Sequence, residues 1–60
     1  MMNAIRVGDR VQVRDAGAQH GRLGTVVAVL PWWRTGGYKV RLDDGLTYHC
    51  AHAVGVDQAA

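Results

Sequence analysis

The segment from Gly21 to Pro31 restricts the possible folds of this chain more than any other part of it. Gly21 and Gly24 precede the run at residues 25–30, and Pro31 ends that run. Glycine accepts a positive φ and the close approach of another backbone, so the pair suits a tight entry into a strand. Residues 25–30 are rich in β-branched side chains and apolar on both faces. We therefore expect a strand that is covered on both sides, or that bends across the middle of a small closed sheet.

The rest of the chain has the pattern of further short strands. Residues 10–14 alternate, with Val11 and Val13 on one face and polar side chains on the other. Residues 38–42 alternate in the same way. Residues 46–49 follow Asp44-Gly45, a dipeptide typical of a two-residue hairpin loop. Residues 50–53 suit a single helical turn, and residues 54–56 a last short strand.

Five short strands without a helical period predict an all-β fold, a five-stranded small barrel. The 60 residues have room for one domain. We expect a short N-terminal lead-in at residues 1–6, the barrel at residues 7–56 and a loose C-terminus at residues 57–60. A domain of this size buries only about 60% of its unfolded surface, and self-association is one remedy for so thin a core.

Charge and cysteine content restrict the partners and the compartment. The formal net charge of +2 is compatible with an anionic partner but is far from that of a nucleic-acid-binding tail. Cys50 is the only cysteine, so an internal disulfide is excluded and a reducing compartment fits. No apolar run approaches the roughly 20 residues that span a bilayer, and the N-terminus lacks the pattern of a signal peptide. We therefore expect a cytoplasmic protein without membrane contact.

Three segments share a glycine and valine pattern: Val-Gly-Asp-Arg-Val-Gln-Val at residues 7–13, Gly-Arg-Leu-Gly-Thr-Val-Val-Ala-Val at residues 21–29, and Tyr-Lys-Val-Arg-Leu-Asp-Asp-Gly at residues 38–45. The pattern, Gly-Asp-x-Val-x-Val, a loop and then Gly-x-x-Gly-x-Val, resembles that of SH3-like small barrels, particularly the KOW-type domains of transcription and ribosomal proteins. The resemblance covers about residues 7–56 and implies an SH3-like barrel. It says less about function, because this barrel hosts unrelated activities.

A second likeness rests on the motif at residues 8–11, its spacing to Gly21, and Gly37-Tyr38. These features are similar to the plasmid-encoded type B dihydrofolate reductases, short SH3-like chains that assemble as tetramers around one central pore. That resemblance implies an oxidoreductase that uses NADPH. The pore would be lined by Thr47, Tyr48 and His49.

The catalytic signature of those reductases differs from this chain. Where they have Val-Gln-Ile-Tyr, residues 46–49 read Leu-Thr-Tyr-His. Thr47 replaces the glutamine that orients both ligands, and His49 replaces the tyrosine. The pore lysine of that family falls at Val13, and its interface tryptophan at Gln19. A threonine lacks the paired amide donor and acceptor of glutamine, which argues against the reductase activity even if the scaffold is shared.

The loop at residues 31–37 holds the most unusual feature, the adjacent Trp32 and Trp33 followed by Arg34. An exposed tryptophan beside an arginine suits stacking on a base or anchoring in a protein interface. The alternative is that one ring covers the thin end of a core without phenylalanine. The other basic residues assigned to the site are Arg14, Arg22, Lys39 and Arg41. If the strands of residues 10–14 and 38–42 come together, their outer faces form a basic stripe; otherwise they form an ordinary solvated face.

His49, Cys50 and His52, with His20, are the residues that could bind a metal. Zinc sites usually combine Cys and His pairs from two segments, and only one segment here offers them, so we predict no metal site. Cys50 has no accompanying carboxylate or oxyanion turn, and we expect a small buried apolar residue rather than a nucleophile. Asp43 and Asp44 fit a hairpin turn for backbone reasons and receive no catalytic role.

The sequence thus predicts a non-enzymatic binding module without a cofactor. It would contact nucleic acid or a protein partner through the loop at residues 31–37 and the adjacent basic strand faces. Two alternatives stay open: the homotetrameric pore-type reductase, which would need NADPH, and an architectural interaction protein.

Overall fold

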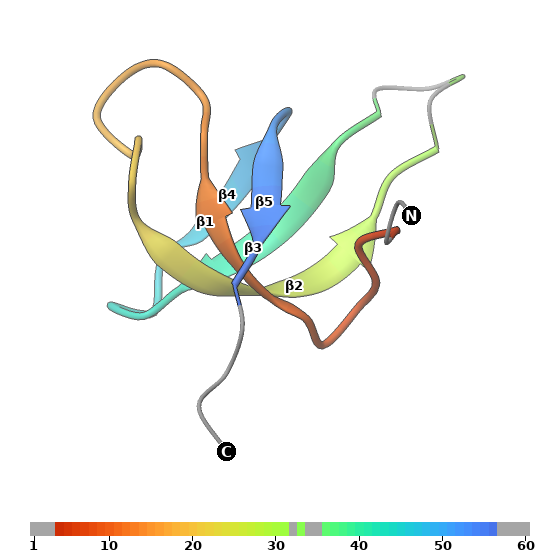
Figure 1. Cartoon of the computed structure of the whole chain (residues 1–60), viewed down its shortest axis with the longest axis horizontal. Helices are drawn as coiled ribbons and strands as arrows, with labels where there is room; N and C mark the ends of the chain where they lie inside the picture. The colour runs from red at the N-terminus through yellow and green to blue at the C-terminus, as the bar shows by residue number, and fades with distance from the viewer. Residues whose placement is uncertain (1–3, 32, 34–35, 57–60) are drawn as a thin grey trace.

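Five antiparallel strands form one sheet in the computed structural model of this chain, which describes residues 4–31, 33 and 36–56 (Figure 1). The strands are β1 (Arg10–Val13), β2 (Leu23–Val29), β3 (Tyr38–Leu42), β4 (Thr47–Cys50) and β5 (Ala53–Gly55). Their order in the sheet is β4-β3-β2-β1-β5, and each neighbouring pair is antiparallel. The expected all-β class with five short strands is confirmed. Across the described ranges, no helix is long and apolar enough to cross a membrane.

The strand boundaries differ from the expected ones by one or two residues, except in β3. β1 ends one residue early, β2 begins two residues early and ends one early, β4 is shifted one residue later, and β5 one residue earlier. The hairpin loop after β3 has three residues rather than two: residues 43–45 lie between the hydrogen-bonded pair Leu42 and Leu46. Leu42 accepts the N–H of Gly45 and donates to Leu46, and Gly45 has a φ of +94°. This is the pattern of a three-residue hairpin loop, in which a turn is followed by a glycine in the left-handed region.

The helical turn expected at residues 50–53 is wrong. Cys50 ends β4 and Ala53 already begins β5. The backbone N–H groups of Ala51 and His52 are bonded to the carboxylate of Asp15, at 2.9 and 2.7 Å. Because these donors are satisfied by a side chain distant in the sequence, the corner between the two strands needs no helical hydrogen bond.

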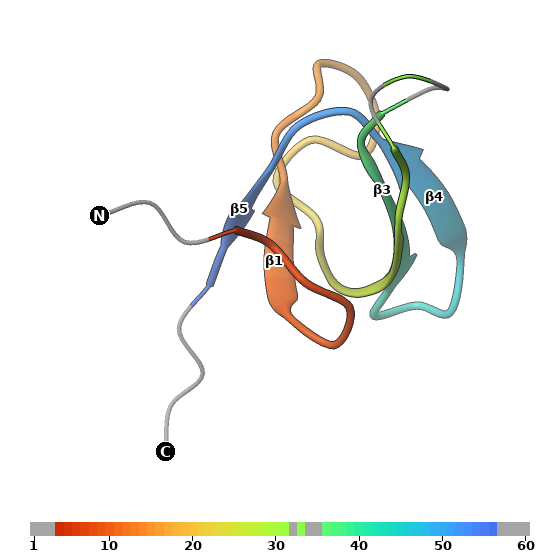
Figure 2. The same ribbon diagram turned by 90° about the vertical axis from the view of Figure 1, so that its right-hand side faces the viewer.

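The sheet is strongly bent, and β2 forms the bend. In Figure 2, β1 and β5 lie on one side, β3 and β4 on the other, and the chain of β2 curves beneath them. β2 pairs with β1 near its start and with β3 from Gly24 to Val29, and a bulge interrupts the second pairing between Val26 and Ala28. A bulge bends its strand and increases the local twist. No pairing among the described strands joins β4 to β5, so the sheet is not closed.

The two glycines at the entry to β2 have the roles expected of them. Gly21 has a φ of +85°, which a residue with a side chain rarely adopts. Gly24 lies against β3: an added Cβ would be 2.6 Å from the carbonyl oxygen of Arg41 and 2.6 Å from a methyl carbon of Val40. The first glycine permits the turn, and the second permits the close approach of two strands.

The core lies on the concave side of the sheet. Its buried members are Val11, Val13, Val26, Val40, Leu42 and Cys50, with Ile5, Tyr38, Tyr48 and Ala53 packed against them. The interpretation of Cys50 as a small buried apolar residue is confirmed. For residues 25–30 the structure has the expected bend but not the cover on both faces, because Val27 and Val29 are 43% and 47% exposed.

Candidate functional site

Lys39 and Arg41 lie on the convex face of β3, opposite the core. Lys39 pairs with His49 of β4, and Arg41 pairs with Thr47. Paired residues of an antiparallel sheet share a face, so these four exposed side chains form one surface, which we call the β3–β4 outer face. Tyr48 points the other way and packs against the core. Of the three residues assigned to a reductase pore, the structure brings Thr47 and His49 together and places Tyr48 on the opposite face.

Two arginines near the start of the sheet already have carboxylate partners. Arg10 makes two hydrogen bonds to Asp43, at 2.7 and 2.9 Å, and a third to the hydroxyl of Thr25. Arg22 is 2.6 Å from Asp44. The Arg10 guanidinium lowers the pKa of Asp43, while the backbone N–H of Leu46 and then Arg22 lower the pKa of Asp44. The hairpin turn after β3 therefore neutralises the cations of β1 and of the loop before β2.

Among the residues that the structure describes, Lys39 and Arg41 have no such partner. Within the described ranges, neither side chain makes an ion pair or a hydrogen bond with another residue. The nearby carboxylates are committed elsewhere: Asp43 and Asp44 to the two arginines, and Asp15 to the corner between β4 and β5. The β3–β4 outer face therefore carries two positive charges that no carboxylate of the described residues neutralises.

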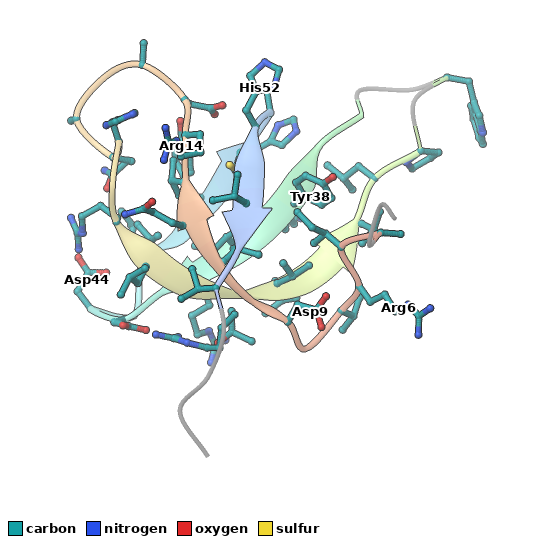
Figure 3. The ribbon with its side chains drawn as sticks, viewed as in Figure 1. Arg6, Asp9, Arg14, Tyr38, Asp44 and His52 are labelled. Carbon is teal, nitrogen blue, oxygen red and sulfur yellow. The ribbon has the colours of Figure 1, made fainter. Side chains whose placement is uncertain are left out.

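The stripe that would join the basic faces of β1 and β3 is not formed, because β2 lies between these strands. Arg10 and Arg41 are both in register with Thr25. Arg14 lies four residues after Arg10, just past the end of β1. Lys39 lies two residues before Arg41 on β3, in the opposite direction along the sheet. At about 3.3 Å per residue, the two are separated by about 20 Å along the strands. Figure 3 shows Arg14 near His52, whose carbonyl accepts the Arg14 backbone N–H.

The described residues between β2 and β3 (30–31, 33 and 36–37) lie beyond the ends of these two strands (Figure 1). Trp33 in this loop is 68% exposed. Trp32 and Arg34, the other two residues predicted here, lie outside the described residues. Since Lys39 is the second residue of β3, it is the cation of the β3–β4 outer face closest in sequence to this loop.

The base of the loop is held against β4. Leu30 donates to the carbonyl of Gly37 at 3.0 Å, and the ring nitrogen Nε2 of His49 lies 3.1 Å from the carbonyl oxygen of Gly36. A carbonyl can only accept, so Nε2 carries the proton in this bond. Gly37, with a φ of +80°, leaves no room for a side chain, because an added Cβ would lie 2.5 Å from the carbonyl oxygen of Cys50. β4 thus holds Gly36 and Gly37, the last two residues of the loop before β3, in place.

Asp15 organises the corner between β4 and β5, a role that sequence reasoning missed. Besides the two backbone donors, its carboxylate accepts the hydroxyl of Tyr48 at 3.1 Å. The backbone N–H of Ala51, followed by the backbone N–H of His52 and the hydroxyl of Tyr48, lowers the pKa of Asp15. Burial, and then the neighbouring Asp15, raises the pKa of Tyr48. These partners lie more than thirty residues after Asp15 in the sequence, so no local sequence pattern could predict the bonds.

The residues considered for metal binding do not gather at one place. No group of three or more His, Cys, Asp or Glu residues that could hold a metal ion occurs in the described part of the chain. His49 lies on the outer face, whereas Cys50 is buried and its thiol lies 2.7 Å from the carbonyl oxygen of His52. Burial, followed by the charge of Asp15, raises the pKa of the Cys50 thiol. This environment disfavours the thiolate that a nucleophile or a metal ligand requires.

Comparison with known proteins adds no relative to this picture. The chain matches no protein-family model, no curated protein and no solved structure.

Proposed function

We propose that the protein is an SH3-like small barrel that serves as a non-enzymatic module for binding single-stranded nucleic acid. One observation carries the proposal. Lys39 and Arg41, two cations of the β3–β4 outer face without a carboxylate partner among the described residues, lie on the strand that follows the loop with the exposed Trp33. The bent five-stranded sheet with its core in the bend supports the barrel, as does the motif pattern of residues 7–45.

The binding mode follows from the strand geometry. Residues two apart on one strand are about 6.6 Å apart and share a face, so Lys39 and Arg41 offer two positive charges in a line. A nucleic acid strand lying along β3 would place phosphates on these charges and a base on the ring of Trp33. Base stacking on tryptophan is tolerant of sequence, because every base has a π face, and it requires an unpaired strand.

The proposal is tested by titrating a fluorescent single-stranded oligonucleotide and measuring anisotropy at several salt concentrations. Arg41→Gln should weaken binding and lower the slope of log K against log salt by about 0.7, the contribution of one phosphate contact on a single strand. Arg14→Gln is the matched control, because it removes the same charge about 13 Å from Arg41 along the strands, with β2 in between. Trp33→Ala should weaken binding about 5- to 150-fold, the loss expected from about 1–3 kcal/mol of stacking.

Equal effects of Arg14→Gln and Arg41→Gln would show that only the overall charge matters and would refute a site on β3. A duplex that binds as tightly as the single strand would refute the stacking role of Trp33. Steady oxidation of NADPH in the presence of dihydrofolate would replace the binding module with the pore-type oxidoreductase.

A further inference from the structure

β4 is an edge strand whose outward hydrogen-bonding groups are available. In the β3–β4 hairpin the bonded pair Leu42 and Leu46 sets the alternation, so Val40 and Tyr48 form the next bonded pair. Thr47 and His49 therefore direct their backbone N–H and C=O groups away from β3. Because β4 ends the sheet order, no described strand receives them.

This edge lacks the features that usually protect a sheet edge. Natural edge strands are shortened, bulged, or given proline or charged side chains, and lysine is especially common. β4 is Thr-Tyr-His-Cys, with no proline, no lysine and a pairing to β3 that runs without a bulge. The opposite edge strand, β5, has only three residues, one of which is glycine. β4 is thus the edge more suited to receiving another strand.

The charge beside this edge selects an anionic partner. Lys39 and Arg41 lie one strand away on the same face, and Thr47, the neighbour of Arg41, is too short to cover it. The arginine side chain is long enough to reach across β4 to a further strand. The backbone just after β4 already binds a carboxylate, that of Asp15. Ala51, the next residue in the outward-facing series after Thr47 and His49, donates its N–H to that carboxylate.

We propose that the edge of β4 binds an acidic segment of a partner protein in an extended conformation, as an added strand. Backbone hydrogen bonds to Thr47 and His49 would provide the affinity, as in other cases of strand addition. Acidic side chains at alternate positions would face Arg41 and Lys39. A second copy of this chain is disfavoured, because pairing β4 with its own copy would bring two basic outer faces together.

The decisive variant is Thr47→Pro. Proline lacks the N–H group, and at Thr47 this group faces outward, so the substitution spares the β3–β4 ladder. Thr47→Val is the matched control because it keeps the N–H and a β-branched side chain. The probes are a labelled peptide that alternates glutamate with valine and its counterpart that alternates lysine with valine. We expect the acidic peptide to bind the natural chain and the Thr47→Val variant, and Thr47→Pro to bind it at least about fivefold more weakly, since a peptide carbonyl loses its partner.

Two further measurements separate strand addition from misfolding of a variant and from the oligonucleotide site. Hydrogen exchange followed by NMR on the natural chain should slow at the amides of Thr47 and His49 when the acidic peptide is added, which does not depend on the folding of any variant. Trp33→Ala should leave peptide binding unchanged while weakening oligonucleotide binding, so that failure of one proposal is separate from failure of the other. Equal binding of the basic peptide, unchanged exchange at both amides, or a dimer in light scattering that Thr47→Pro converts to monomer would overturn the proposal.

Discussion

Gly24→Ala tests the contact that brings the central strand against β3. The Cβ of the new alanine would lie 2.6 Å from the carbonyl oxygen of Arg41 and 2.6 Å from a methyl carbon of Val40. Both distances are well inside the roughly 3.5 Å of an ordinary contact between heavy atoms. The valine is fully buried, and the carbonyl belongs to the backbone of the paired strand. Neither neighbour can move without disturbing the core or the β2–β3 ladder.

The expected loss of stability is about 1–3 kcal/mol, the usual cost of overpacking a filled interior. A domain of 60 residues has a free energy of unfolding of about 3–9 kcal/mol at the usual stability per residue. The substitution should therefore remove a large part of the stability. With a shift of about 4–8 °C per kcal/mol for domains of this size, the melting temperature should fall by about 4–24 °C.

The assay is thermal and urea unfolding followed by circular dichroism, with Gly55→Ala as the matched control. Gly55 also lies in a strand, it has no positive φ, and an added Cβ would meet no atom within 4 Å. Alanine there should be neutral or raise the stability by about 0.4–1 kcal/mol, because it restricts the unfolded chain. Similar melting temperatures for the two variants would refute the argument that close approach at Gly24 holds β2 against β3.

Three other outcomes follow from the packing. Leu42→Ala should lower the free energy of unfolding by about 2–5 kcal/mol because it empties part of the core, whereas Leu46→Ala, at a residue 50% exposed, should change it by less than about 0.5 kcal/mol in urea unfolding. The Asp15 carboxyl has a lowered pKa in the folded chain, so its bonds stabilise the fold above the ordinary carboxyl pKa and are lost as pH falls through the lowered value. Melting curves below about pH 4 should therefore show a steeper loss for the natural chain than for Asp15→Asn. Cys50, buried and with a raised pKa, should react with iodoacetamide in urea and resist it in buffer; rapid alkylation of the folded chain would contradict its placement.

Most of the strand pattern could be predicted because alternation is a local property. Val11, Val13, Val40 and Leu42 were placed on inward faces by the period of two, and all four are buried. The bulge in β2 could not be predicted in this way. It depends on how Val26 and Ala28 meet β3 rather than on the composition of the run.

The corner after Cys50 shows where local reasoning fails. Residues 50–53 have side chains compatible with a helical turn, and nothing near them argues against one. The competing interaction comes from Asp15, 36 and 37 residues away in sequence from Ala51 and His52. A carboxylate that satisfies two consecutive N–H groups stabilises a sharp corner, and that preference outweighs weak helix propensity.

The sequence indicated basic and aromatic residues for the candidate site, but it could not show which basic residues belong together. The reason is the distribution of carboxylates in the fold. In sequence, Asp43 and Asp44 appear as turn residues, and all the basic residues appear equivalent. In the fold, the same turn supplies the partners of Arg10 and Arg22, while the side chains of Lys39 and Arg41, like those of Arg6 and Arg14, have no carboxylate partner among the described residues. The turn thus reverses the chain and also neutralises Arg10 and Arg22. Asp43→Asn would test this second role: it should leave the Arg10 guanidinium without its carboxylate partner, across Thr25 from Arg41, so oligonucleotide binding should become tighter and more dependent on salt.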